Sequence, residues 1–217
     1  MGWLRARKER RLAERDEYRQ LRRLVDEDVT VFGEQLAGLH VETLGDPLGA
    51  EAQADYRRAL ELYDDAKRAF AGAQTAAAVR EVVPVLVDGR YHLACVLARR
   101  DGHDLPARRE PCFFNPQHGP AADDVPWTPR GGVEREVPVC RADLLRLTAG
   151  REPEVRQVRI GDRWVPWYQQ QEARGLLATA LGPRALEGVP KYVMFQADLD
   201  RMGDALGGSG AGGMGGI

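Results

Sequence analysis

The chain has 217 residues, of which 43% are hydrophobic and 29% are charged, so it holds enough apolar material for a buried core. Its formal net charge of −2 excludes a protein that binds polyanions through bulk charge alone. Three cysteines are too few for a disulfide scaffold, and the charged start lacks the apolar segment of a secretory signal. The longest apolar run, residues 82–87, is far shorter than the ~20 residues of a membrane span. We therefore expect a cytoplasmic protein without a transmembrane segment.

Residues 1–104 are predicted to form a helical hairpin or bundle with the character of a coiled coil, because strong helix formers dominate and apolar residues recur at helical spacing. Gly-Asp-Pro and Gly near residues 40–50 predict a turn. Pro84 and Gly89 are expected to bend or split the third helix. The residues expected on the apolar faces are Tyr18, Leu21, Val25, Val29, Phe32, Leu36 and Leu39, then Tyr56, Leu60, Tyr63 and Phe70, then Val79, Val82, Leu86, Leu93 and Leu97. Alanines flank the second group and are expected to allow a close approach of a neighbouring helix.

Residues 105–170 differ in composition, since nine of the thirteen prolines and three of the four tryptophans lie between 106 and 167. We expect a compact Cys/His/Trp module with short strands at 109–115 and 134–140, a helix at 141–150 and a hairpin around Gly161 and Asp162. Short helical segments are expected over 171–202, and the glycine-rich residues 203–217 are expected to be disordered. The predicted fold class is α+β.

The order of motifs in the second half is distinctive. Gly-Arg-Tyr-x-Leu-Ala-Cys at 89–95 leads to Pro-Cys-Phe-Phe-Asn-Pro-x-His-Gly at 111–119 and Asp-Val-x-Trp at 124–127. Val-Pro-x-Cys at 137–140 and Val-Pro-Trp-x-Gln at 165–169 follow. The chain over about residues 85–170 thereby resembles an uncharacterised actinobacterial family found C-terminally in some TPM-domain proteins. The resemblance supports the module's boundaries and implies no known activity. Asn115 stands where that family has Asp, which argues against a catalytic carboxylate at this position.

Three soft ligands, Cys112, His118 and Cys140, suggest a zinc-stapled binding module, with Cys95 or His103 as the fourth ligand. The Cys-x2-Cys pairs typical of structural zinc are missing, and a disulfide between Cys112 and Cys140 is a further alternative. We favour a simpler interpretation, in which the cysteines are small buried side chains and His118 hydrogen-bonds a turn. The two module cysteines are then expected to lie close together without a fourth ligand and without a cofactor.

A thiol-dependent enzyme is the alternative from another class. Cys112 would be its nucleophile, His118 its base, and Asp123 or Asp124 would orient the base. No phosphate loop, His-Glu-x-x-His or Gly-x-Ser-x-Gly motif accompanies these residues. We therefore expect a protein that is not an enzyme.

The stretch "CFFNPQHG" at 112–119 is predicted to form a corner. Phe113 and Phe114 are expected on opposite faces of a short strand, with one of them in the core. Asn115 would start a turn, Gly119 would adopt a positive φ, and His118 would cap the turn.

Two groups of surface candidates remain. The first 23 residues hold nine Lys or Arg against four Asp or Glu, and this basic start could meet a membrane surface, nucleic acid or a partner. The tryptophans of the module form either a stacking surface for a ligand or part of its core. The candidate binding residues are Arg5, Arg7, Lys8, Arg10, Arg11, Trp127, Trp164 and Trp167. The favoured function is a non-catalytic scaffold or protein-binding protein that self-associates through its N-terminal helices.

Overall fold

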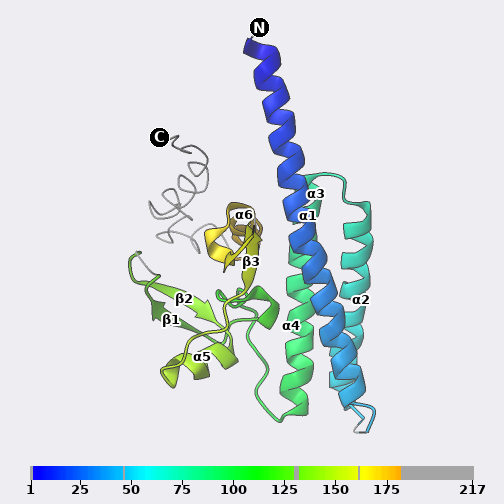
Figure 1. The fold of residues 1–217 in the computed structure, drawn as a ribbon. Helices are drawn as coiled ribbons and strands as arrows, with labels where there is room; N and C mark the ends of the chain where they lie inside the picture. The colour runs from blue at the N-terminus through cyan, green and yellow to red at the C-terminus, as the bar shows by residue number, and fades with distance from the viewer. Residues whose placement is uncertain (1, 46, 130–131, 161, 182–217) are drawn as a thin grey trace, which may run out of the picture.

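The computed structural model describes residues 2–181 except 46, 130–131 and 161, and it shows an α+β fold (Figure 1). Helices fill the N-terminal half, and two small antiparallel sheets with short helices fill the rest of the described chain. The segments expected beyond residue 181, including the glycine-rich tail, lie outside the described residues. Among those that are described, no helix combines the length and the apolar composition needed to cross a bilayer.

Helix α1 (Gly2–Glu42) is the longest element, and its C-terminal half lies against α2 (Ala50–Gly72) and α4 (Val82–Arg100) (Figure 1). The apolar stripe predicted for it is confirmed: the six positions from Leu21 to Leu39 are buried, and Tyr18 is half-buried. The turn predicted near residues 40–50 is also confirmed, since α1 ends at 42 and α2 begins at 50.

The prediction for α2 is partly wrong. Leu60 is exposed, and Tyr56 and Tyr63 lie only at the edge of the core. The buried face consists of Ala52, Ala59, Leu62, Ala66 and Phe70. Three of these five are alanines, which allow α2 and α4 to approach closely along their whole contact, whereas a search for large apolar residues favours the tyrosines.

The break in the third segment occurs earlier than predicted. A short helix α3 (Ala76–Arg80) ends at Glu81, and α4 then runs without interruption through Gly89. Pro84 lies in the first turn of α4, where a missing N–H costs nothing. Gly89 is required by packing, because a Cβ atom there would lie 2.7 Å from two ring carbons of Phe32.

Strands β1 (Asp123–Trp127) and β2 (Arg135–Val139) form one antiparallel pair, with Val125 opposite Val137. Helix α5 (Arg141–Thr148) follows β2 directly, and the predicted hairpin is present as β3 (Gln157–Ile160) and β4 (Arg163–Pro166). The strand predicted at 109–115 is wrong: this segment makes one isolated bridge, between Pro111 and Pro120. Pro111 within the segment has no N–H to donate, and the Cys112 N–H and the Phe113 N–H donate to different segments, to Gly119 and to Pro138.

An aromatic cluster forms the core of the module. Phe113 and Phe114 are both fully buried, so the prediction that they point to opposite faces of a strand, with only one in the core, is wrong. The Phe113 ring centroid lies 5.0 Å from Trp127 and 5.5 Å from both Trp167 and Tyr168. The Trp167 indole N–H donates to the Phe113 carbonyl at 2.8 Å, which satisfies a buried donor. This cluster fixes the backbone from which Cys112 projects.

The module is joined to the helices by a buried polar network centred on Asp28 of α1. Arg156 donates to both Asp28 carboxylate oxygens, at 3.0 and 3.2 Å, and Gln117 donates to the same group at 2.9 Å. Arg90 of α4 donates to the Asp28 carbonyl at 2.9 Å. After β4, the 3-10 helix η2 (Trp167–Gln169) leads to α6 (Gln171–Leu181), which packs on α1 and α4. The two halves of the chain therefore form one continuous structure.

Candidate metal centre

Residues 112–119 form a closed loop beside α4. The Cys112 N–H donates to the Gly119 carbonyl at 3.0 Å, so the two ends of the loop are held together. The Asn115 side chain accepts from the Gln117 N–H at 3.0 Å and starts the 3-10 helix η1 (Pro116–His118). Gly119 has a φ of 87°, a conformation that favours glycine. The predicted turn chemistry of Asn115 and Gly119 is confirmed, and the loop brings Cys112 and His118 to one side.

Cys140 reaches the same place from the other direction. The Phe113 N–H donates to the Pro138 carbonyl, and the Ala122 N–H donates to the Val139 carbonyl, both at 2.7 Å. These bonds attach the loop to the end of β2. Cys140 follows β2 as the N-cap residue of α5, and its sulfur accepts from the Asp143 N–H at 3.4 Å. The same turn of α5 places Asp143 next to the two cysteines.

Four side chains from these segments converge on one point: Cys112, His118, Cys140 and Asp143. One ligand atom from each lies within 4.8 Å of all the others. The carboxylate Oδ2 of Asp143 lies 3.1 Å from His118 Nδ1, 3.4 Å from the sulfur of Cys112 and 3.6 Å from that of Cys140. The sulfur of Cys140 lies 3.5 Å from His118 Nδ1. The predicted proximity of the two cysteines is confirmed, but the expectation that no fourth ligand joins them is wrong.

These separations match the edges of a tetrahedron around a zinc ion. Zinc–sulfur bonds of about 2.3 Å and zinc–nitrogen or zinc–oxygen bonds of about 2.0 Å give tetrahedral edges of about 3.5 Å from sulfur to nitrogen or oxygen. The same bond lengths give about 3.3 Å from nitrogen to oxygen. Four of the six pairs of donor atoms, at 3.1 to 3.6 Å, fall close to these edges, and all six lie within 4.8 Å.

The second oxygen of Asp143 is held away from the cluster. Oδ1 accepts from the Glu154 N–H at 2.8 Å and from Arg146 at 3.1 Å, and Arg146 also pairs with the Glu154 carboxylate at 2.8 Å. The carboxylate is therefore fixed in one orientation, with Oδ2 toward the sulfurs and the imidazole. Such an outer layer of hydrogen bonds is what orients ligands in metal centres.

The electrostatics of the cluster favour a cation. The contact with Cys112, together with His118 and the Asp143 N–H, lowers the pKa of Cys140 to about 5, which favours its thiolate form. The contact with Cys140 and burial raise the pKa of Cys112. Burial works against ionisation of Asp143, but the Glu154 N–H and Arg146 outweigh it and hold its pKa below the usual value. A buried thiolate beside a buried carboxylate is costly without a positive charge between them.

The arrangement differs from the thiol-enzyme relay expected from the sequence, because Asp123 and Asp124 face Arg109 and do not orient His118. In such a relay the nucleophile contacts one imidazole nitrogen, and the orienting carboxylate contacts the other. Here Cys140 and Asp143 both contact Nδ1 of His118, while Nε2 faces the carboxylate of Glu154 at 3.8 Å. Four donor atoms converge on one point, and such a group could hold a metal ion.

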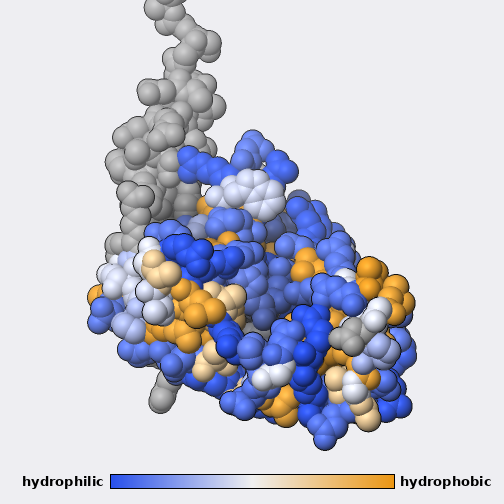
Figure 2. Space-filling model, turned by 90° about the horizontal axis from the view of Figure 1, so that it is seen from below, coloured by the Kyte–Doolittle hydropathy of each residue, from blue (hydrophilic) through white to orange (hydrophobic). Residues whose placement is uncertain are grey.

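A hollow of about 840 Å³ lies beside the cluster, lined on one side by His118 and Cys140. Its other walls come from the end of α4, from residues 101–107 and from α5, including the exposed side chains of Leu105 and Leu145. Figure 2 shows this lower end of the molecule, where apolar patches alternate with hydrophilic residues. Cys112 and Asp143 lie behind this surface and are fully buried.

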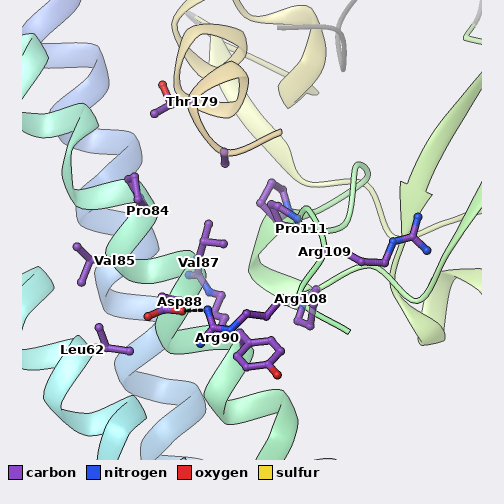
Figure 3. Close-up of a pocket in the computed structure, with 15 residues that line it drawn as sticks. Leu62, Pro84, Val85, Val87, Asp88, Arg90, Arg108, Arg109, Pro111 and Thr179 are labelled. Atoms are coloured by element: carbon purple, nitrogen blue, oxygen red, sulfur yellow. Dashed lines mark hydrogen bonds and ion pairs between the residues drawn. The ribbon is translucent and has the colours of Figure 1, made fainter. Parts of the chain in front are cut away.

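A second cavity, of about 470 Å³, lies between α4 and the loop (Figure 3). Arginines dominate its polar lining, and each is already paired within the protein. Arg108 pairs with Asp88, Arg109 pairs with Asp124, and Arg90 contacts Asp28. This lining shows no cluster of nucleophiles or metal ligands comparable to the first.

The remaining candidates from the sequence lie elsewhere. Cys95 is buried within α4 and is not part of the cluster; burial raises its pKa. His103 lines the 840 Å³ hollow without joining the four ligands. Asp123 and Asp124 are exposed on β1, and both face Arg109 rather than His118. His118 does not act as a simple cap of its turn, because its ring contacts Cys140 and Asp143.

The tryptophans do not share a surface. Trp167 is fully buried and Trp127 half-buried in the aromatic cluster, whereas Trp164 is exposed on β4. The five basic candidates from the sequence all lie exposed on the first turns of α1, namely Arg5, Arg7, Lys8, Arg10 and Arg11.

Asp143 is the site residue that the sequence did not reveal. A signal for it existed: Cys140 and Asp143 have the spacing of a Cys-x2-Cys zinc pair, with a carboxylate in place of the second thiol. The N-cap position of Cys140 then puts both side chains at the start of one helix, where both are buried.

No protein-family model matches the chain, and no curated protein and no solved structure is significantly similar to it. The geometry of the site therefore carries the functional argument alone.

Proposed function

We propose that this protein is a non-catalytic binding scaffold whose C-terminal module is stapled by one zinc ion. The ligands are Cys112, His118, Cys140 and Asp143. The observation that supports this most directly is the convergence of these four donor atoms within 4.8 Å of one another. Two thiols, one imidazole and one carboxylate are donors that zinc accepts, whereas magnesium and calcium select oxygen ligands.

A structural role for the ion fits the ligand number. Four protein ligands fill a tetrahedral zinc, whereas catalytic zinc usually keeps one position for water or substrate. The ligands also join the 112–119 loop to the start of α5. The two-stranded sheet alone would hold these two segments together only weakly. Zinc would thereby stabilise the module.

The charge of the site supports the same proposal. Two thiolates and a carboxylate would exceed the charge of a zinc ion by one, and Arg146, bound to Asp143, offsets that excess. A balanced buried cluster avoids the cost of an uncompensated charge.

The broader function follows from the surfaces around the module. We infer that partners bind beside the staple, where the 840 Å³ hollow and the exposed Leu105 and Leu145 are available. Self-association through the N-terminal helices belongs to the same proposal. We also propose membership of the actinobacterial family that the motifs resemble; its Cys-Phe-Phe and Val-Pro-x-Cys motifs supply two of the ligands.

The proposal is tested by measuring zinc in the purified protein and in two cysteine variants. We expect about one zinc per chain in the wild type and in Cys95→Ser, because Cys95 lies outside the cluster. Cys140→Ser should lose the ion and unfold more easily, since metal binding stabilises the fold. Equal zinc content in all three proteins, or none in any, would contradict the staple.

Thiol alkylation of the same samples separates the staple from the thiol enzyme. With zinc bound, Cys112 and Cys140 should resist alkylation until a chelator is added, because a coordinated thiolate is a poor nucleophile. A metal-free protein with one thiol that reacts unusually fast would support the enzyme instead.

A further inference from the structure

The N-terminal third of α1 extends beyond the rest of the helical bundle (Figure 1). Every residue from 3 to 16 is exposed, and the buried stripe of the helix begins only at Leu21. At a rise of 1.5 Å per residue, this exposed part is a rod about 20 Å long. The other described residues do not cover this part of α1, so a partner can bind to it.

Four of the basic side chains of α1 lie along one line, three on this rod and the fourth just beyond it, whereas Arg5, Arg7 and Arg10 lie off the line. Lys8, Arg11, Arg15 and Arg19 are spaced by three, four and four residues, so their side chains project from one face of the helix over about 16 Å. Among the described residues, Lys8, Arg11 and Arg15 have no ion-pair partner, and Arg19 has only the exposed contact with Asp16 at 3.4 Å. The chain as a whole is slightly acidic, so the line is a local feature.

Apolar residues on the same rod do not form a face. Trp3, Leu4 and Leu12 are all exposed, and at 100° per residue Trp3 and Leu12 point in opposite directions. A helix that lies in a membrane surface needs its apolar residues on one side. The continuation of the buried stripe toward the N-terminus is also polar, with Glu14 and Arg10 in place of apolar residues, so the rod cannot prolong a coiled coil.

We propose that this line of Lys8, Arg11, Arg15 and Arg19 binds the phosphate backbone of double-stranded nucleic acid without sequence preference. The molecule that binds this line of cations must be recognised by its charge alone. A polyanion meets this condition, and an apolar partner does not. An α-helix fits the major groove of a duplex, which is about 12 Å wide, and a rod that projects beyond the bundle can enter it. Side chains on one face then meet the phosphates of one strand. This inference is independent of the zinc site.

The test measures binding of the full chain to a 20-base-pair DNA duplex of mixed sequence at several salt concentrations. If four cations contact phosphates, the logarithm of the binding constant should fall with the logarithm of the salt concentration with a slope of about −3 to −4. The variant Lys8→Glu/Arg11→Glu/Arg15→Glu should bind at least about 10-fold more weakly, with a slope smaller by about three. Because all three positions are exposed, the substitutions should leave the fold intact, and a circular dichroism melt of the variant verifies this.

A matched control changes the same charge elsewhere. Arg57→Glu/Lys67→Glu/Arg151→Glu alters three exposed cations outside the rod and shifts the net charge equally. It should retain most of the affinity and the slope. Equal losses in both triple variants would mean that only net charge matters and would overturn the proposal. Binding to vesicles with 30% anionic lipid but not to the duplex would overturn it in favour of a membrane.

Discussion

Arg146 illustrates how one side chain orients the candidate centre without supplying any of its four donor atoms. Its guanidinium contacts Oδ1 of Asp143 at 3.1 Å and the Glu154 carboxylate at 2.8 Å. These bonds leave Oδ2 of Asp143 as the atom that faces His118 and the two sulfurs. Arg146 is thus a positioning residue, and its positive charge offsets the excess negative charge of the ligands.

Replacing this arginine should weaken zinc binding without removing a ligand. We predict that Arg146→Gln lowers zinc affinity by about 10- to 100-fold, the range typical when an outer partner of a metal ligand is lost. Competition with a chromogenic chelator measures the affinity. Arg141→Gln, an exposed arginine on the same helix, is the control and should bind zinc as the wild type does. An unchanged affinity in Arg146→Gln would show that Asp143 needs no such support.

The sequence shows which residue types could bind a metal, but it shows less well which of these residues come together at one site. Cys112, His118 and Cys140 were identifiable because soft ligands are rare in the chain. Asp143 was not, because an aspartate at the start of a helix is a common helix-stabilising residue and 24 other acidic residues precede it in the chain. Only the fold shows that its carboxylate is fully buried beside two sulfurs.

In the helices too, the spacing of apolar residues predicts some of the buried positions, whereas the packing of neighbouring helices determines the others. The stripe on α1 was predictable because large apolar residues recur at spacings of three and four. The face of α2 was not, since Ala59 and Ala66 are buried while Leu60 is exposed. Small residues are buried where two helices approach each other closely. The sequence of one helix does not show where the neighbouring helix packs against it.

Gly89 is the clearest case of a residue set by its neighbour. It lies inside α4, where glycine lowers helix stability, yet a Cβ atom would come within 2.7 Å of the Phe32 ring. We predict that Gly89→Ala lowers the free energy of unfolding by about 1 to 3 kcal/mol, because overpacking outweighs the gain in helix propensity.

The matched control is Gly38→Ala in α1, where no atom lies within 4 Å of the added Cβ position. That variant should raise stability by up to about 1 kcal/mol, as helix propensity alone dictates. Urea denaturation of both variants gives the two values. Stabilisation by Gly89→Ala would mean that α1 and α4 are not as closely packed as the structure shows.

Over the whole molecule, the junction between the helices and the module depends on Asp28. Its partners Arg90, Gln117 and Arg156 are between 62 and 128 residues away along the chain. Burial lowers the pKa of Arg90, and Asp28 counteracts that effect. The α+β class and the order of elements could be predicted from composition and periodicity, but this junction could not, because partners so far apart leave no local pattern.

Removing this carboxylate should be far more damaging than removing an exposed one. We predict that Asp28→Ala lowers the free energy of unfolding by about 3 to 5 kcal/mol, because two buried arginines lose their counter-charge. Asp26→Ala, two residues away on the same helix and exposed, should change it by no more than about 0.5 kcal/mol. Denaturant unfolding at saturating zinc compares the two. Similar small losses in both would show that the junction contributes little to stability.

The central claim is that one zinc ion joins the loop and α5 through two sulfurs, one nitrogen and one oxygen. X-ray absorption at the zinc edge of the purified protein tests it most directly, because scattering by sulfur and by nitrogen or oxygen is resolved by distance. We predict two sulfur ligands at about 2.3 Å from the zinc ion and two nitrogen or oxygen ligands at about 2.0 Å from it. A spectrum with only nitrogen and oxygen ligands, or a protein that retains no zinc, would contradict it.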